Sequence, residues 1–165
     1  MQIEIFLSHN SHDSAWCEQL ATEAKALGIL TYLAERNVQP GADLAEKIQS
    51  AIRRCSAFLV LITDNSVNAP YVQQEIGYAI ANNKILIPLV QPSIASESLA
   101  MLQGKEFISF DFTAPAEGLK NLNVVLTDLV NKQTQREQEQ RDKDNALLVM
   151  AIAGLVLIAL HANST

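Results

Sequence analysis

The fold of this chain is decided by two consecutive stretches, AFLVLIT at residues 57–63 and NSVNAPYVQQEIGYAIA at residues 65–81. The first is an unbroken apolar run, which is typical of a parallel strand buried on both faces. The second begins with polar loop residues and then predicts a helix from Pro70, because the first helical turn does not use the N–H group that proline lacks. A buried strand, a polar loop and a helix in this order predict one repeat of an α/β sheet.

The helix that begins at Pro70 carries the first candidate site. Tyr71 and Glu75 are four residues apart, so their side chains project from the same face of the helix. They follow the carboxyl end of a strand, which is where open α/β sheets bind ligands. From this spacing alone, a glutamate that simply faces solvent remains the main alternative.

The same alternation continues along the chain. Each short apolar run predicts a strand, and Asp13 or Ser14 can cap the helix after the first one. Pro88, inside the fourth run, predicts an irregular or unpaired position. The pattern predicts a flavodoxin-like α/β fold with a five-stranded parallel sheet of order 2-1-3-4-5 and helices on both faces. The predicted strands are residues 3–7, 29–33, 57–63, 85–90 and 107–110.

The composition favours one acidic domain with a small appendage. The chain has 165 residues and a net charge of −6, and the acidic balance argues against nucleic acid as a partner, because nucleic-acid-binding domains are usually basic. Cys17 and Cys55 form no CxxC pair, and His9 and His12 lack a third ligand at a suitable spacing, so we expect no metal site. The N-terminus lacks the basic segment of a signal peptide.

The C-terminal part of the sequence changes character twice. Residues 132–145 contain no apolar residue and predict a polar linker or a helical extension. Residues 146–162 are almost uniformly apolar and predict a C-terminal apolar helix that spans a membrane or packs in a self-association interface. If this helix spans a membrane, the basic residues before it place the preceding domain in the cytoplasm. The alternative is a soluble cytoplasmic oligomer.

With these parts placed, the chain resembles the TIR (Toll/interleukin-1 receptor) domain family, in particular its bacterial members. IFLSHNSHD at residues 5–13 is similar to the first box of the family, and the loop containing Gln39-Pro40-Gly41 is similar to its BB loop. SVNAPYVQQEIGYAI at residues 66–80 is similar to the αC segment of the family. The resemblance places the TIR domain at residues 1–131.

The resemblance also implies which residues form a site. Glu75 matches the glutamate that is catalytic in the NAD-cleaving members of the family, and Tyr71 stands where those enzymes often have tryptophan. The residues implied to contact the dinucleotide are Phe6, Ser8, His9, Arg36, Pro40, Gly41 and Tyr71.

The function implied by the resemblance is that of an NAD+ nucleosidase, which cleaves the nicotinamide–ribose bond to give ADP-ribose or a cyclic or variant ADP-ribose. NAD+ is then the substrate and no cofactor is needed. One carboxylate suffices for this reaction, because nicotinamide leaves as a neutral group and requires no general acid. The resemblance further implies a homo-oligomer assembled through TIR–TIR contacts, acting in bacterial antiphage defence or signalling. The alternative is a non-enzymatic TIR scaffold that signals by self-association at a membrane.

Overall fold

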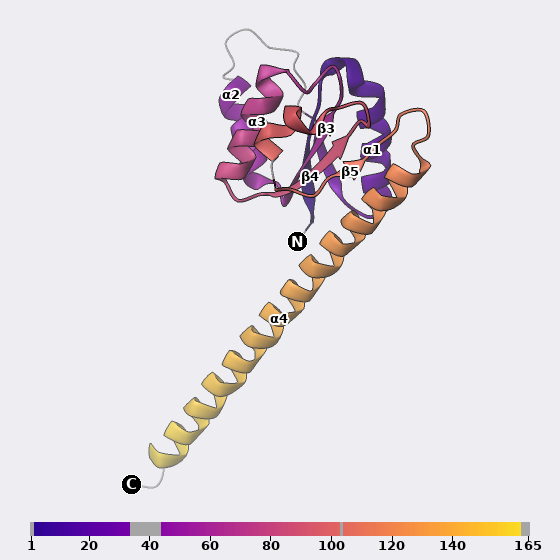
Figure 1. Ribbon diagram of the computed structural model, residues 1–165. Coiled ribbons are helices and arrows are strands. Elements are labelled where there is room, and N and C mark those ends of the chain that lie inside the picture. Colours follow the sequence, from indigo (N-terminus) through magenta and orange to yellow (C-terminus); the bar gives the residue numbers. More distant parts are fainter. Residues whose placement is uncertain (1, 34–43, 103, 163–165) are drawn as a thin grey trace. The chain divides into compact units, whose positions relative to one another are not determined.

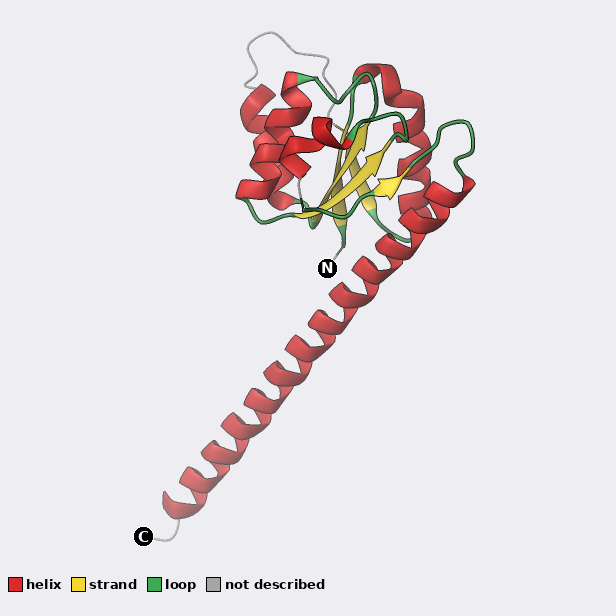
Figure 2. Cartoon of the chain, in the orientation of Figure 1, coloured by secondary structure: helices red, strands yellow, loops and turns green. Residues whose placement is uncertain are grey.

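The computed structural model describes the backbone of residues 2–33, 44–102 and 104–162, and their side chains except at residues 100, 101 and 152–162. It shows a five-stranded parallel sheet of order β2-β1-β3-β4-β5 (Figures 1 and 2). The predicted α/β fold and strand order are therefore confirmed. The strands are β1 (Glu4–Ser8), β2 (Leu30–Leu33), β3 (Ala57–Ile62), β4 (Ile85–Val90) and β5 (Ile108–Ser109).

Helices cover both faces of the sheet. The helix α1 lies on one face, and α2 and α3 lie on the other (Figure 1). The first turns of α4 belong to the side of α1, where Nδ2 of Asn123 donates a hydrogen bond to Oε2 of Glu23 at 3.3 Å. The helices are α1 (Ser14–Ala26), α2 (Leu44–Arg54), α3 (Pro70–Ala81) and α4 (Ala116–Ala162), with short 3-10 turns at η1 (Ser11–Asp13) and η2 (Ser96–Leu102).

The strand β3 lies at the centre of the core. All six of its residues are buried, as expected for an apolar run in a parallel sheet. On the face covered by α2 and α3, the ring of Phe6 stacks against the rings of Tyr32 and Phe58, with centroid separations of 5.5 and 5.4 Å. This aromatic layer joins β1 to both of its neighbouring strands.

Pro88 lies inside β4, yet the pairing of β4 with β3 runs through it without interruption. The N–H of Gln91 donates to the carbonyl of Ile62 on β3, and the carbonyl of Val90 accepts from the N–H of Phe110 on the opposite edge. Because alternate residues of a strand direct their N–H groups to opposite edges, the nitrogen of Pro88 faces the side of β5. The pairing with β5 begins only after this position, so no ladder bond is lost there. Of the two predicted outcomes, the unpaired position is found and the irregularity is not.

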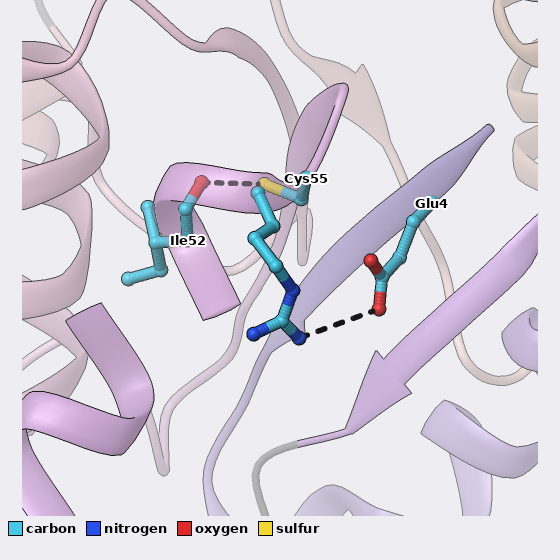
Figure 3. Close-up of polar contacts among 4 residues, drawn as sticks. Glu4, Ile52 and Cys55 are labelled. Atoms are coloured by element: carbon cyan, nitrogen blue, oxygen red, sulfur yellow. Dashed lines mark hydrogen bonds and ion pairs between the residues drawn. The ribbon is translucent and has the colours of Figure 1, made fainter. Parts of the chain in front are cut away.

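The end of α2 is fastened to the strands beside it (Figure 3). The Sγ atom of Cys55 donates to the carbonyl oxygen of Ile52 at 3.0 Å, and Arg54 lies 4.0 Å from the carboxylate of Glu4 in β1. The ammonium group of Lys84 donates to the carbonyl oxygen of Cys55 at 2.7 Å. A cation at this place complements the negative end of the helix. The contacts of Arg54 and Lys84 link the end of α2 to β1 and to the residue that precedes β4.

The chain divides into a compact unit of residues 2–127 and a second unit that starts at Asp128. The helix α4 continues through residues 132–145, so the polar stretch is helical. At the start of this polar stretch, Nζ of Lys132 lies 2.7 Å from Oδ2 of Asp128, one helical turn earlier.

The apolar stretch that follows does not support the predicted membrane insertion of residues 146–162. In the part of the chain that the structure describes, no helix is both long and apolar enough to cross a membrane. The large apolar side chains described in this stretch are exposed; they are Leu147, Leu148, Val149 and Met150.

The first turns of α4 approach β5 so closely that only glycine fits at position 118. A Cβ atom on Gly118 would lie 2.6 Å from Cδ2 of Phe110 and 3.2 Å from the carbonyl oxygen of Ser109. The ring of Phe110 is fully buried and packs edge-on against Trp16 at a centroid separation of 5.5 Å. An added methyl group therefore has no free space.

We expect Gly118→Ala to lower the free energy of unfolding by about 1–3 kcal/mol, because overpacking outweighs a gain in helix propensity of about 1 kcal/mol. Urea unfolding followed by the fluorescence of Trp16, the only tryptophan, measures the change. Lys120→Ala, at an exposed position of the same helix, is the control and should change this free energy by less than about 0.5 kcal/mol. An unchanged value for Gly118→Ala would show that α4 lies farther from β5.

The thiol of Cys17 makes stability depend on pH in the alkaline range. Burial, together with the nearby charges of Asp13 and Glu18, raises the pKa of this thiol from 9.0 to about 12. Below pH 9 the thiol is protonated in both the folded and the unfolded state. Between pH 9 and 12 only the unfolded state releases the proton, so the free energy of unfolding falls as the pH rises, by up to about 1.4 kcal/mol per pH unit.

We expect Cys17→Ala to show a shallower alkaline loss of stability than the wild type, because alanine has no proton to release. The measurement is the free energy of unfolding in urea at several pH values between about 8 and 11. Equal slopes for the two proteins would contradict the assignment of this loss to Cys17.

Candidate active site

The candidate site lies at the carboxyl edge of the sheet, where the direction of the connections reverses. The strand β2 lies on one side of β1 and β3 lies on the other. Because the connections leave the carboxyl ends of β1 and β3 in opposite directions, a crevice is expected at this point. Glu75 belongs to α3, the helix that follows β3, and its carboxylate meets Ser8 at the carboxyl end of β1.

The helix α3 has one polar and aromatic face. Pro70 occupies its first turn, as predicted, and Ala69 precedes it in an extended conformation. Nε2 of Gln73 donates to the carbonyl oxygen of Val67 at 2.7 Å, which fastens the first turn to the loop before it. Residues three, four and seven positions apart share a helix face. The face concerned consists of Tyr71, Gln74, Glu75 and Tyr78.

A pocket of about 230 Å³ lies between α2 and α3. Its lining is mostly carbon, and Glu75 is the only charged residue among the described lining residues. The residue Glu75 is only 5% exposed, so its carboxylate lies inside the protein, and the solvent-facing alternative does not apply. The lining residues are Ala45, Ile48, Gln49 and Ile52 from α2, and Tyr71, Gln74, Glu75 and Tyr78 from α3.

Ser8 holds the carboxylate of Glu75 from the end of β1. Ser8 is the last residue of that strand and is fully buried, and its hydroxyl donates a hydrogen bond to Oε2 of Glu75. It is not among the lining residues of the pocket, so it reaches the site through Glu75. A hydrogen bond to a carboxylate is charge-assisted and offsets part of the cost of removing the charge from water.

A polar network joins the loops that follow β1 and β3. The Oγ1 of Thr63 donates to Oδ2 of Asp13 at 2.8 Å, and Nδ2 of Asn65 donates to Oδ1 of Asp13 at 2.8 Å. In addition, Nδ2 of Asn10 donates to the carbonyl oxygen of Asn65 at 2.9 Å. Of the two predicted caps, Asp13 and Ser14, the structure places Asp13 at the N-cap of α1. Its side chain makes no capping bond, because both of its oxygens accept from the loop after β3.

Tyr78 is a lining residue that the sequence reasoning missed. Its hydroxyl accepts a hydrogen bond from Nη1 of Arg53, and Cζ of Arg53 lies 6.0 Å from the centre of its ring. A signal was available, because position 78 is seven residues after Tyr71 and so lies on the same helix face. The contribution of α2 to the pocket has no such signal, since it depends on which helix packs beside α3.

The other predicted contact residues lie outside this pocket or outside the described residues. Phe6 is fully buried in the aromatic layer of the core and is not a lining residue. His9 is 8% exposed, has Nδ1 at 3.4 Å from the carbonyl oxygen of Leu7, and is not a lining residue either. The structure therefore brings Ser8, Glu75 and Tyr71 together. The predicted residues that fall outside the described ones are Arg36, Pro40 and Gly41.

The chemistry available at this site is that of one buried carboxylate beside aromatic rings. A carboxylate attracts a positive charge strongly where water is excluded, and the faces of tyrosine rings add a cation–π attraction. Over the residues whose side chains are placed, no group of three or more histidine, cysteine, aspartate or glutamate residues is arranged to hold a metal ion. The pocket is therefore suited to a flat organic group that carries or develops positive charge.

Two relatives are similar to part of this sequence. Human Toll-like receptor 1 is 26% identical over 99 residues, which amount to 56% of this chain and 13% of the receptor. The probable 2′ cyclic ADP-D-ribose synthase BdTIR of Brachypodium distachyon is 25% identical over 95 residues, which amount to 54% of this chain and 42% of that protein. The chain thus spans less than half the length of either relative.

A solved structure and a protein-family model also match this chain. The structure of the CMP N-glycosidase BcmB of Clostridium botulinum matches with a TM-score of 0.56 and 18% identity, covering 73% of this chain and 98% of that one. A likeness at this identity shows a shared fold. The family model described as the TIR domain matches residues 5–123, which include β1 from Ile5 on, the pocket and Glu75. The chain therefore belongs to the TIR domain family.

Proposed function

We propose that the chain is a TIR-domain NAD+ nucleosidase that cleaves the bond between nicotinamide and ribose, with Glu75 as the catalytic carboxylate. The observation that carries the proposal is the position of Glu75, which is buried and lines a pocket together with two tyrosine rings. NAD+ is the substrate and no cofactor takes part. The product is ADP-ribose or a cyclic or variant ADP-ribose.

The pocket suits the nicotinamide end of NAD+. In NAD+ the nicotinamide ring is a flat pyridinium cation, and a carboxylate beside aromatic rings attracts such a group. The ring faces available in the pocket come from Tyr71 and Tyr78, and the side-chain amides come from Gln49 and Gln74. An amide can pair with the carboxamide of nicotinamide, because it offers both a donor and an acceptor.

The reaction requires little from the protein besides this charge. The bond between C1′ of ribose and N1 of the pyridinium ring breaks, and its electron pair moves to N1, so nicotinamide leaves as a neutral molecule. The ribose is left as an oxocarbenium-like cation, which the carboxylate of Glu75 stabilises. Water then adds to C1′ and releases a proton, which gives ADP-ribose. Attack by a nucleophilic atom of the same molecule gives a cyclic product instead.

The size of the pocket favours a site that is completed by a second copy of the chain. Its volume of about 230 Å³ is smaller than the roughly 300–1,000 Å³ of complete small-molecule sites. The part of the pocket that described residues line has room for the nicotinamide end of NAD+. We expect the remaining surface to come from assembly of TIR domains, and we expect the activity to serve defence or signalling.

The relative from Brachypodium distachyon supports the same chemistry. Its name describes a probable synthase of 2′ cyclic ADP-D-ribose. A cyclic ADP-ribose is NAD+ without its nicotinamide, so its synthesis from NAD+ breaks the same bond. Because the shared sequence is 25% identical, the reaction is a proposal for this chain and needs a direct test.

We expect Glu75→Gln to lower the rate of nicotinamide release by at least about a hundredfold, because glutamine keeps the shape of the side chain but lacks the charge that stabilises the transition state. Full-length protein is incubated with NAD+ over a range of protein concentrations, and nicotinamide and the ADP-ribose products are separated by chromatography. CMP serves as a second substrate in the same assay.

The control for this experiment is Glu18→Gln, on the exposed side of α1 and therefore on the opposite face of the sheet. It removes the same charge and should leave the rate within about twofold. If the wild-type protein leaves NAD+ intact at every concentration, the proposal is wrong and the non-enzymatic scaffold becomes the better reading. If CMP alone is cleaved, the reaction class holds and the substrate is different.

We expect Tyr71→Ala to raise KM for NAD+ by about tenfold, since ring stacking and cation–π contacts contribute about 1 kcal/mol or more when water is excluded. Tyr71→Phe keeps the ring and should leave KM within about twofold. Initial rates over a range of NAD+ concentrations give both values. Equal KM for all three proteins would show that the pyridinium ring does not stack on Tyr71.

A further inference from the structure

Ser8 is placed to control the carboxylate of Glu75 without touching a substrate. Its side chain is fully buried, its hydroxyl donates to Oε2 of Glu75, and it does not belong to the lining of the pocket. The two residues are 67 positions apart in the sequence and come from β1 and α3. The contact therefore exists only because the fold brings the end of β1 beside α3.

The hydroxyl of Ser8 is held in a fixed position by the sheet. The strand β1 pairs with β2 on one side and with β3 on the other, and Ser8 is in register with Val60 of β3. A serine side chain has a single rotatable bond before its oxygen, so a fixed backbone leaves the donor few positions. A glutamate side chain has three rotatable bonds and needs an external contact to adopt one position.

The loop between β3 and α3 is held by the polar network described above and by a buried serine of its own. The Oγ of Ser66 accepts from the N–H of Thr63 at 2.7 Å and donates to the carbonyl oxygen of Leu61 at 2.7 Å. Thr63 also donates to Asp13 in the loop after β1. The loop that follows β1 and the loop that precedes α3 are thus joined by hydrogen bonds.

We propose that Ser8 is a positioning residue for Glu75: its hydroxyl holds the carboxylate in one orientation toward the pocket and keeps it ionised, so that the charge faces the ribose as nicotinamide leaves. The second effect follows because a hydrogen-bond donor stabilises the ionised form of a carboxyl group. This inference rests on the proposed function of Glu75. It changes the role implied for Ser8 from a contact with the dinucleotide to a contact with the catalytic residue.

The test compares Ser8→Ala with the wild type in steady-state NAD+ cleavage by the full-length protein over a range of pH. We expect kcat to fall by about ten- to a hundredfold, as for the loss of a hydrogen bond to a charged group, while KM stays within about twofold. The acid limb of the pH profile of kcat should move to higher pH, because the carboxylate loses its donor. Ser8→Thr restores a hydroxyl and should recover most of kcat.

The controls separate a positioning role from a general loss of structure. Ser56→Ala removes a serine hydroxyl at the opposite edge of the sheet, before β3, and should change neither kcat nor the pH profile. Circular dichroism and thermal unfolding show whether each variant is folded. If Ser8→Ala does not fold, Ser8→Cys replaces it, since a thiol is similar in size but a weak donor, and it should show the same loss of kcat.

Three results would overturn the inference. One is a folded Ser8→Ala or Ser8→Cys that retains kcat within about twofold of the wild type. Another is a rise in KM with an unmoved acid limb, which would mean that Ser8 binds the substrate. The third applies if the wild-type protein cleaves no NAD+. In that case the proposed function fails separately, and the contact between Ser8 and Glu75 is tested by a 13C NMR titration of the Glu75 carboxyl. A midpoint that Ser8→Ala leaves unmoved would exclude the contact itself.

Discussion

The burial of one carboxylate is the constraint on which the rest of this site depends. Removing the charge of Glu75 from water costs several kcal/mol unless hydrogen bonds compensate. The hydroxyl of Ser8 supplies such a bond, but it can do so only because β1 lies between β2 and β3 and ends beside α3. The strand order that defines the fold is thus also what brings a hydrogen-bond donor to the buried carboxyl group of Glu75.

The two sides of the Glu75 carboxylate differ in kind. On the side of the strands, hydrogen bonds among Asp13, Thr63 and Asn65 join the loops after β1 and β3. On the side of the helices, the pocket is lined mainly by carbon from α2 and α3. A carboxylate in the wall of such a pocket would attract a cation more strongly than one in water, since the attraction is stronger where water is excluded.

The TIR domain and the remainder of the chain differ in how far their side chains are buried. The family match ends at residue 123 and the compact unit ends at Thr127, where packing against the sheet has already buried Leu122 and Leu126. From Asp128 on, the described side chains of α4 are exposed or half-buried, and those of residues 138–151 are all exposed. Uniform apolarity after residue 145 indicated burial in a membrane or an interface. Hydropathy, however, shows only that such side chains are unfavourable in water. It does not identify the lipid or protein surface that would bury them.

The sequence alone determined the elements and their order, because apolar runs and helical periodicity are local and each strand or helix has its own signal. It also placed Tyr71 and Glu75 on one helix face, since their spacing fixes that geometry. Only the tertiary structure decided that Asp13 bonds across to Thr63 instead of capping α1, that Ser8 meets Glu75, and that α2 supplies half of the pocket. These contacts join residues far apart in sequence, and no local pattern encodes which donor a buried acceptor will meet once the chain has packed.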